Sequence, residues 1–242
     1  MRMPLPTPHP STAGPSQRGA IATKLLGVIV ILGALGFAGY WFFIRSDSAA
    51  KPKIENTKVS AGGAVDGTWK LTPNGAKGSF VGYRVHEQFA DGLVDNEATG
   101  RTHDVSGAMT VKGTQVTDVS ITANLATLKS DKDFRDQRLH SSGLETDKFP
   151  TATFVSTAPL TLPSAPKKGA TVKLSVTGDL TLHGVTKSVT APLEGRWDGN
   201  TIQVVGEVPI TMSDFSISPP TSPLIAEVDD HGTLEMQLFF TK

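Results

Sequence analysis

The sequence of 242 residues contains no cysteine. This absence excludes disulfides, thiolate metal ligands, a cysteine nucleophile and lipid attachment through a cysteine. Motifs for other chemistry are also missing. There is no Gly-x-Ser-x-Gly nucleophile elbow, no glycine-rich phosphate loop and no His-x-x-x-His pair. The sequence therefore gives little support for a hydrolase or a zinc site, and no enzymatic activity or metal cofactor is expected.

The chain also lacks an excess of charge of one sign, because 23 basic residues balance 23 acidic ones. The balance conceals two regions. Up to Lys58 there are seven Lys/Arg and two acidic residues, whereas from Asp66 onward there are sixteen and twenty-one. An acidic domain without a basic cluster has no surface for a phosphate backbone, so nucleic acid is not an expected partner.

One long apolar run stands out near the N-terminus. Residues 25–44 contain no charged side chain, and twenty helical residues match the roughly 30 Å hydrocarbon core of a membrane. A cleaved signal peptide has a shorter apolar region, although the small residues 48–50 leave processing open. The sequence thus divides into a disordered tail (1–23), a transmembrane helix (24–45), a spacer (46–65) and a folded domain (66–242).

The orientation of this span is not decided by its flanking charges. Three Lys/Arg precede the span and three follow it, so the positive-inside rule gives no direction. A single span near the N-terminus commonly acts as a signal-anchor. We therefore expect a single-pass protein of the cell membrane with its C-terminal domain outside the cytoplasm.

The folded domain is dominated by a period of two. Apolar or small residues alternate with polar ones over 172–182, 119–125, 202–212 and 234–240. Alternation of this kind is typical of antiparallel strands that bury one face. Predicted strands lie near 67–72, 78–87, 97–111 (as one or two segments), 115–127, 150–160, 170–183, 185–196, 200–212 and 232–241.

Glycine-containing turn signals separate these strands. They are Asp91–Gly92, Lys112–Gly113, His183–Gly184, Asp198–Gly199 and His231–Gly232. About eight strands joined by short loops favour an all-β fold, an antiparallel up-and-down barrel. Only residues 130–144 look helical, and one or two turns there are expected to cap an end of the barrel. The charges of 131–138 predict a solvated helix face with an Asp131–Arg135 pair, or alternatively a polar rim at the barrel mouth.

Several segments resemble the YceI-like family of polyisoprenoid-binding proteins. VTGDLTLHGVTK at 176–187 is similar to the family hallmark, and SFVGYRV at 79–85, GRTHDVSG at 100–107 and RDQRLHSSGLETDKFPTATF at 135–154 agree in order. The resemblance covers the whole of 66–242. It implies an extended lipocalin-like barrel that holds an isoprenoid chain, as in exported bacterial proteins.

Two interpretations of the barrel interior remain open. Eight strands enclose a space that is either just filled by side chains or holds one small ligand. The leading hypothesis is a membrane-anchored protein that binds an isoprenoid-type lipid or quinone in its lumen, with no other cofactor. The alternative is a filled barrel that serves as a structural or interaction domain of the cell envelope.

The residues predicted to line the lumen are apolar, apart from the Tyr83 hydroxyl, which is expected to meet a ligand head group. They are Phe80, Val81, Tyr83, Val85, Met109, Ile121, Leu125, Phe154, Leu180, Leu182, Ile210 and Met212. His183, the most prominent histidine, continues the polar positions in the alternation of its strand. We interpret it as a residue that fixes its turn by a hydrogen bond, in preference to a ligand contact.

Overall fold

The computed structural model describes residues 29–36, 48–71, 78–89, 95–219 and 225–242, and the chain forms two units, 1–45 and 46–242. In the first unit, residues 29–36 are helical. The tail and the remainder of the predicted transmembrane helix lie outside the described residues. Within the described ranges, no helix has the length and apolar character needed to cross a membrane.

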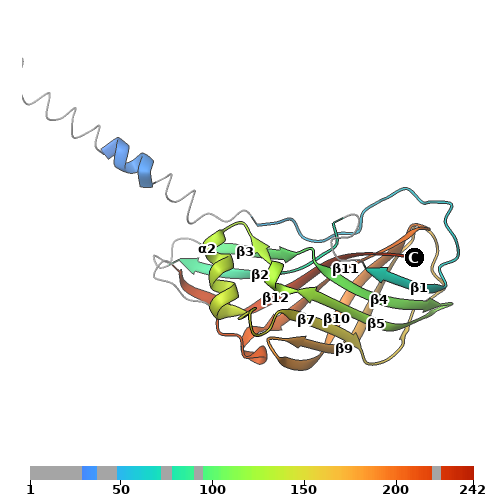
Figure 1. The fold of residues 1–242 in the computed structure, drawn as a ribbon. Coiled ribbons are helices and arrows are strands. Elements are labelled where there is room, and N and C mark those ends of the chain that lie inside the picture. Colours follow the sequence, from blue (N-terminus) through green and yellow to red (C-terminus); the bar gives the residue numbers. More distant parts are fainter. Residues whose placement is uncertain (1–28, 37–47, 72–77, 90–94, 220–224) are drawn as a thin grey trace, which may run out of the picture. The chain divides into compact units, whose positions relative to one another are not determined.

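The second unit is an antiparallel β-barrel with a short helix (Figure 1), which confirms the predicted all-β antiparallel barrel. Its strands are β1 (Gly67–Leu71), β2 (Phe80–Phe89), β3 (Asp95–Thr102), β4 (Val105–Lys112), β5 (Gln115–Asn124), β6 (Lys129–Ser130), β7 (Thr151–Ser156), β8 (Leu160–Thr161), β9 (Thr171–Leu182), β10 (Val185–Trp197), β11 (Thr201–Thr211) and β12 (Ile225–Thr241). The helical elements are η2 (Leu125–Thr127), α2 (Asp133–Arg138), the π-helical η3 (Leu139–Gly143) and η4 (Met212–Phe215).

The barrel closes through the short strand β1. The sheet runs in the order β1-β4-β5-β7-β9-β10-β11-β12, and β1 also pairs with β12 through Lys70 and Thr241. Strands β2 and β3 continue the sheet beyond β12, and β6 pairs with β3. The predicted up-and-down order is therefore wrong in the N-terminal part of the domain, because β1 pairs with β4 and β12, and β2 pairs with β12. Helix α2 lies across one end of the barrel (Figure 1), which we call the capped end; the opposite end is the open end. The helix predicted within 130–144 is therefore confirmed.

Three predicted turns are confirmed. Gly113, Gly184 and Gly199 join β4 to β5, β9 to β10 and β10 to β11, each with a positive φ that favours glycine. The turn predicted at His231–Gly232 is wrong, because both residues lie inside β12, where the register shifts opposite β2. A glycine within a strand is typical of such an irregularity. The turn predicted at Asp91–Gly92 lies outside the described residues.

The alternation of β9 shows why these sequences form a barrel wall. Val176, Gly178, Leu180 and Leu182 are buried, while the polar residues between 173 and 179 are exposed. Since successive side chains of a strand point to opposite faces, one face is withdrawn from water and the other stays solvated. The largest buried side chains include Trp69 and Phe240, which pack in one cluster.

Residues 48–64, which belong to the expected spacer 46–65, lie along the outer wall of the barrel without regular secondary structure; we call this segment the strap. Side chains of the wall bind its backbone. Arg84 donates to the Ala49 carbonyl at 2.7 Å and Arg101 to the Ala50 carbonyl at 2.5 Å. Farther along, Arg196 binds the carbonyls of residues 55 and 57 at 2.7 and 2.8 Å. The strap is therefore held by specific contacts with the wall.

An ion network lies beneath the start of the strap. Glu235 is fully buried (0% exposed) and pairs with Arg84 at 3.1 Å and with Arg101 at 2.7 Å. Arg84 also pairs with Glu97. A buried carboxylate is tolerated only when its hydrogen-bonding capacity is satisfied, as it is here by two guanidinium groups.

Candidate functional site

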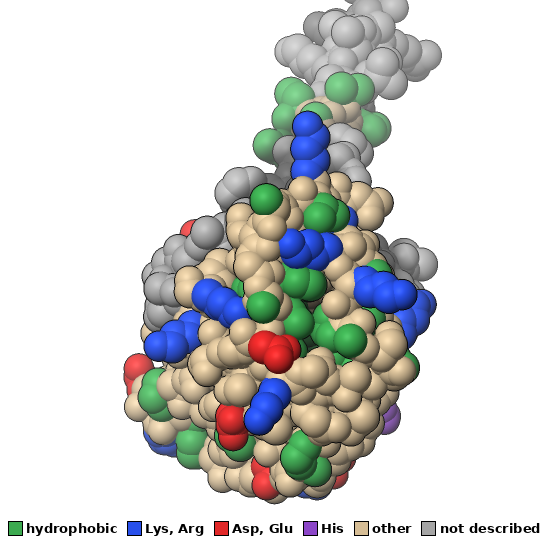
Figure 2. Space-filling view, turned by 90° about the vertical axis from the view of Figure 1, so that its right-hand side faces the viewer, with side chains coloured by type: hydrophobic (Ala, Val, Ile, Leu, Met, Phe, Trp, Pro, Cys, Tyr) green, Lys and Arg blue, Asp and Glu red, His purple; other side chains and the backbone are tan. Residues whose placement is uncertain are grey.

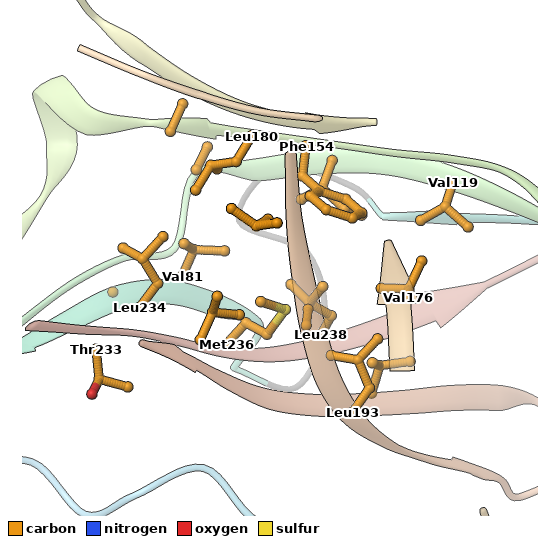
Figure 3. A pocket seen from close by; sticks show the side chains of 18 of the residues that line it. Val81, Val119, Phe154, Val176, Leu180, Leu193, Thr233, Leu234, Met236 and Leu238 are labelled. Atoms are coloured by element: carbon orange, nitrogen blue, oxygen red, sulfur yellow. The ribbon is translucent and has the colours of Figure 1, made fainter. Parts of the chain in front are cut away.

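The interior of the barrel is not filled. It contains a cavity of about 270 Å³ whose lining surface is almost entirely apolar. Figure 3 shows Phe154 and Leu180 on one side of this space, with Leu234 and Met236 on the other. The cavity runs from the side chains of the capped end to residues of the open end, such as Pro166. Its size is close to that of small ligand pockets, which start near roughly 300 Å³.

The space exists because small residues occupy positions that face the lumen. Ala123, Ala152, Ala191, Gly195 and Gly232 all line it, and none reaches the opposite wall. Protein interiors are normally packed as tightly as organic crystals, with few voids larger than a water molecule. A void of this size with a dry lining therefore offers space and surface for a hydrocarbon.

The open end gives access to this lining. Figure 2 views the barrel from that end and shows hydrophobic side chains gathered at its centre, with lysine and arginine side chains around them. Val65, Pro166, Lys167, Ala170 and Trp197 contribute to the cavity there.

Eleven of the twelve residues predicted to line the lumen do so: Val81, Tyr83, Val85, Met109, Ile121, Leu125, Phe154, Leu180, Leu182, Ile210 and Met212. Their role in binding a ligand stays a prediction. The placement of Phe80 was wrong. Phe80 follows the opposite parity to Val81, and its ring packs beneath the Arg101 guanidinium, 3.9 Å from the ring centre. Adjacent residues of a strand cannot both face the lumen.

Sequence reasoning missed a polar group at the capped end. Arg135 of α2 and Glu87 of β2 both line the cavity and are 6% and 4% exposed. They form a bidentate pair with two N···O distances of 3.0 Å. The predicted Asp131–Arg135 pair is confirmed, but the prediction of a solvated helix face is wrong for Arg135 and Asp136, which are buried. The sequence did indicate the position of Glu87, because Glu87 continues the alternation of Val81, Tyr83 and Val85 and therefore lies on the same face of β2.

Tyr83 lies beside this pair. Its ring covers Gly100 of β3, where an added Cβ would come within 2.4 Å of it. The Tyr83 hydroxyl is buried and has no hydrogen-bond partner among the described residues. Burial raises the pKa of the phenol well above its usual range, while the charge of Arg135 opposes this shift. The hydroxyl therefore stays protonated and able to donate.

His183 has a structural role, as predicted. It adopts a positive φ of 52° in the turn before Gly184 and does not line the cavity. Its Nδ1 lies 3.2 Å from the Phe215 carbonyl oxygen and its Nε2 3.1 Å from a Glu145 carboxylate oxygen. These bonds tie three segments together near the capped end. Across the described part of the chain, no three acidic or histidine side chains gather into a metal site.

Comparisons with known proteins agree with this architecture. A family model described as the YceI-like domain matches residues 69–240. Protein YceI of Shigella flexneri is 35% identical over 179 residues, covering 70% of this chain and 86% of that protein. Protein YceI of Salmonella newport is 32% identical over the same length and coverage.

Two solved structures share the fold. A polyisoprenoid binding domain from Saccharophagus degradans, implicated in plant cell wall breakdown, has a TM-score of 0.55 at 18% identity, covering 72% of this chain and 97% of that domain. Burkholderia cenocepacia BcnA has a TM-score of 0.51 at 21% identity, covering 66% of this chain and 95% of that protein.

Proposed function

Because this chain belongs to the YceI-like family, we propose that it binds an isoprenoid-type lipid or quinone inside its barrel, as a binding protein and not an enzyme. The observation that carries the proposal is the aliphatic cavity of about 270 Å³. The polyisoprenoid-binding domain of Saccharophagus degradans, which shares the fold, supports the class of ligand. The filled-barrel alternative expects no such space.

The chemistry of the lining suits a branched hydrocarbon. Isoprenoid chains offer methyl-branched apolar surface and almost no hydrogen-bonding groups along their length. Their affinity would come from apolar area removed from water, at about 25 cal/mol per Å², reduced by the cost of association and ordering. The medium-sized side chains of the wall, such as Val176 and Leu180, provide contacts along the whole lumen.

We propose further that residues 24–45 anchor the protein in the cell membrane with the barrel outside the cytoplasm. The support is the uncharged run of residues 25–44 and its length. Extraction of membranes at alkaline pH tests the anchor, since an integral protein stays in the pellet. Release of the full chain into the supernatant would contradict it. Protease accessibility of the barrel in intact spheroplasts tests the orientation.

The binding proposal is tested on the full chain, purified natively in a mild detergent and extracted with organic solvent for mass spectrometry. We expect a prenyl species at near-unit stoichiometry. After delipidation, a prenyl lipid present at 100 times its Kd should stabilise the fold by about 2.7 kcal/mol, measured by thermal unfolding. An extract without prenyl species, together with no thermal shift, would contradict the proposal.

A further inference from the structure

Polar groups border both ends of the lumen, and their chemistry bears on the orientation of a ligand. The middle of the cavity is apolar, whereas Tyr83, Glu87 and Arg135 border its capped end and Lys167, Arg196 and Trp197 its open end. On the basis of the proposed function, we propose that the polar end of the ligand lies at the capped end against the Tyr83 hydroxyl, and that it is an uncharged oxygen acceptor such as a quinone carbonyl or a prenol hydroxyl.

In the described part of the chain, the Tyr83 hydroxyl is a donor at this end without a partner. Glu87 and Arg135 use both carboxylate oxygens and two guanidinium nitrogens on each other. Among the described residues the phenol has no partner, although buried polar groups in proteins are nearly always hydrogen-bonded. Its ring lies against Gly100, and the Leu128 side chain also lies beside this glycine. A ligand oxygen would supply the missing partner.

The hydroxyl is not open to the empty lumen. Its oxygen is covered, while the side chain borders the cavity. A ligand oxygen at the end of the lumen would therefore reach it through a small shift of the ring or of α2. This element is only six residues long and continues into the π-helical turn of η3.

The pairing of charges at the capped end disfavours an anionic head group. The charged groups around the phenol include Arg135, Glu87, Asp131 and Asp136. Lys129 lies 3.5 Å from Asp136, but its side chain is 68% exposed and its charge is screened by solvent. A phosphate would have to compete with Glu87 and Asp131 for the Arg135 guanidinium, whereas a neutral oxygen needs only a hydrogen-bond donor.

The open end offers a competing donor. Trp197 lines the cavity there, and its indole nitrogen is also buried without a partner within the described ranges. The ammonium of Lys168 lies over its ring, 5.3 Å from the centre. A ligand oriented the other way would accept a hydrogen bond from this indole. The two orientations therefore predict different effects of substituting Tyr83 and Trp197.

The experiment compares three probes on delipidated full chain in detergent: a C20 prenol, its monophosphate, and a hydrocarbon with the same branched chain and no oxygen. Dissociation constants come from competition against one fluorescent prenyl ligand. For the wild type we expect the prenol to bind about tenfold more tightly than the hydrocarbon, and the phosphate to bind no better than the hydrocarbon. In Tyr83→Phe, the prenol should bind like the hydrocarbon, whose affinity stays unchanged.

Two further measurements separate this role from a structural one. Without ligand, Tyr83→Phe should unfold at the same temperature as the wild type or higher, because it removes a buried donor that has no partner. Trp197→Phe should retain the preference for the prenol over the hydrocarbon, whatever its effect on both affinities.

Three results would overturn the orientation. They are equal binding of prenol and hydrocarbon by the wild type, loss of the preference in Trp197→Phe but not in Tyr83→Phe, and tightest binding of the phosphate. If none of the probes binds, the proposed function itself fails.

Discussion

Replacing Gly195 with phenylalanine should obstruct the lumen from its own wall. Gly195 lies on β10 opposite Val172 and Val204, and it lines the cavity. A Cβ added there would meet a single atom within 4 Å, the Gln203 carbonyl oxygen at 3.9 Å. The position therefore accepts a Cβ atom without a clash, and the phenyl ring would occupy space that the ligand needs.

The expected loss of affinity follows from the carbon atoms displaced. A phenyl ring takes roughly the place of one isoprene unit of five carbons. At about 0.8 kcal/mol per buried carbon group, this costs about 4 kcal/mol of binding free energy, or about a thousandfold in Kd. A ligand that shifts within the lumen away from the ring would recover part of this, so a weakening of at least about tenfold is expected.

The matched control is Gly195→Ala, which adds only the unhindered Cβ. It should bind prenyl lipid like the wild type and unfold at the same temperature or slightly higher, since glycine weakens a strand interior. Both variants are measured by prenyl-lipid titration and by circular dichroism. A folded Gly195→Phe protein that binds as tightly as Gly195→Ala would refute the idea that the ligand occupies the lumen.

Two further predictions concern groups outside the lumen. Glu235→Gln should lower the free energy of unfolding by about 3–5 kcal/mol in urea titration, because it leaves two arginines without their buried counter-charge. The control is Glu207→Gln, which breaks an exposed pair with Lys51 and should change the free energy of unfolding by less than about 0.5 kcal/mol. A hydrogen bond from Lys148, and then one from His183, lowers the pKa of Glu145. The ionised carboxylate therefore adds stability above its usual pKa of 4.5, and this is lost as the pH falls through the lowered pKa. Glu145→Gln should flatten the dependence of unfolding temperature on pH below 4.5, whereas an unchanged dependence would show that the pair adds nothing.

The alternation of side chains was sufficient to predict the barrel and most of its lining. It fixed β9, β10 and β11 to within a residue or two, because burial on one side leaves a period of two in the sequence. The prediction failed at Phe80, because Phe80 and Val81 were both assigned to the lumen although neighbouring residues of a strand face opposite sides. It also failed at Arg135, whose burial depends on Glu87, 48 residues away. Long-range pairing of charges leaves no local pattern.

The strap was unpredictable for a different reason. Its residues follow no hydrophobic period, and the wall binds largely its backbone carbonyls, which every residue type possesses. Arg84 and Arg101, whose side chains hold the strap, look like ordinary polar residues of strands in the local sequence. Only the three-dimensional arrangement identifies them as a binding surface for the chain's own N-terminal segment.

The position of the strap decides where this protein can be shortened for experiments. The sequence pattern of strands starts near residue 66, which suggests a cut at that point. Such a cut would remove the carbonyls of Ala49 and Ala50 and uncover the carboxylate of Glu235. A soluble version with native stability should therefore begin before Ser48, whose hydroxyl already binds the Glu97 carbonyl of the wall.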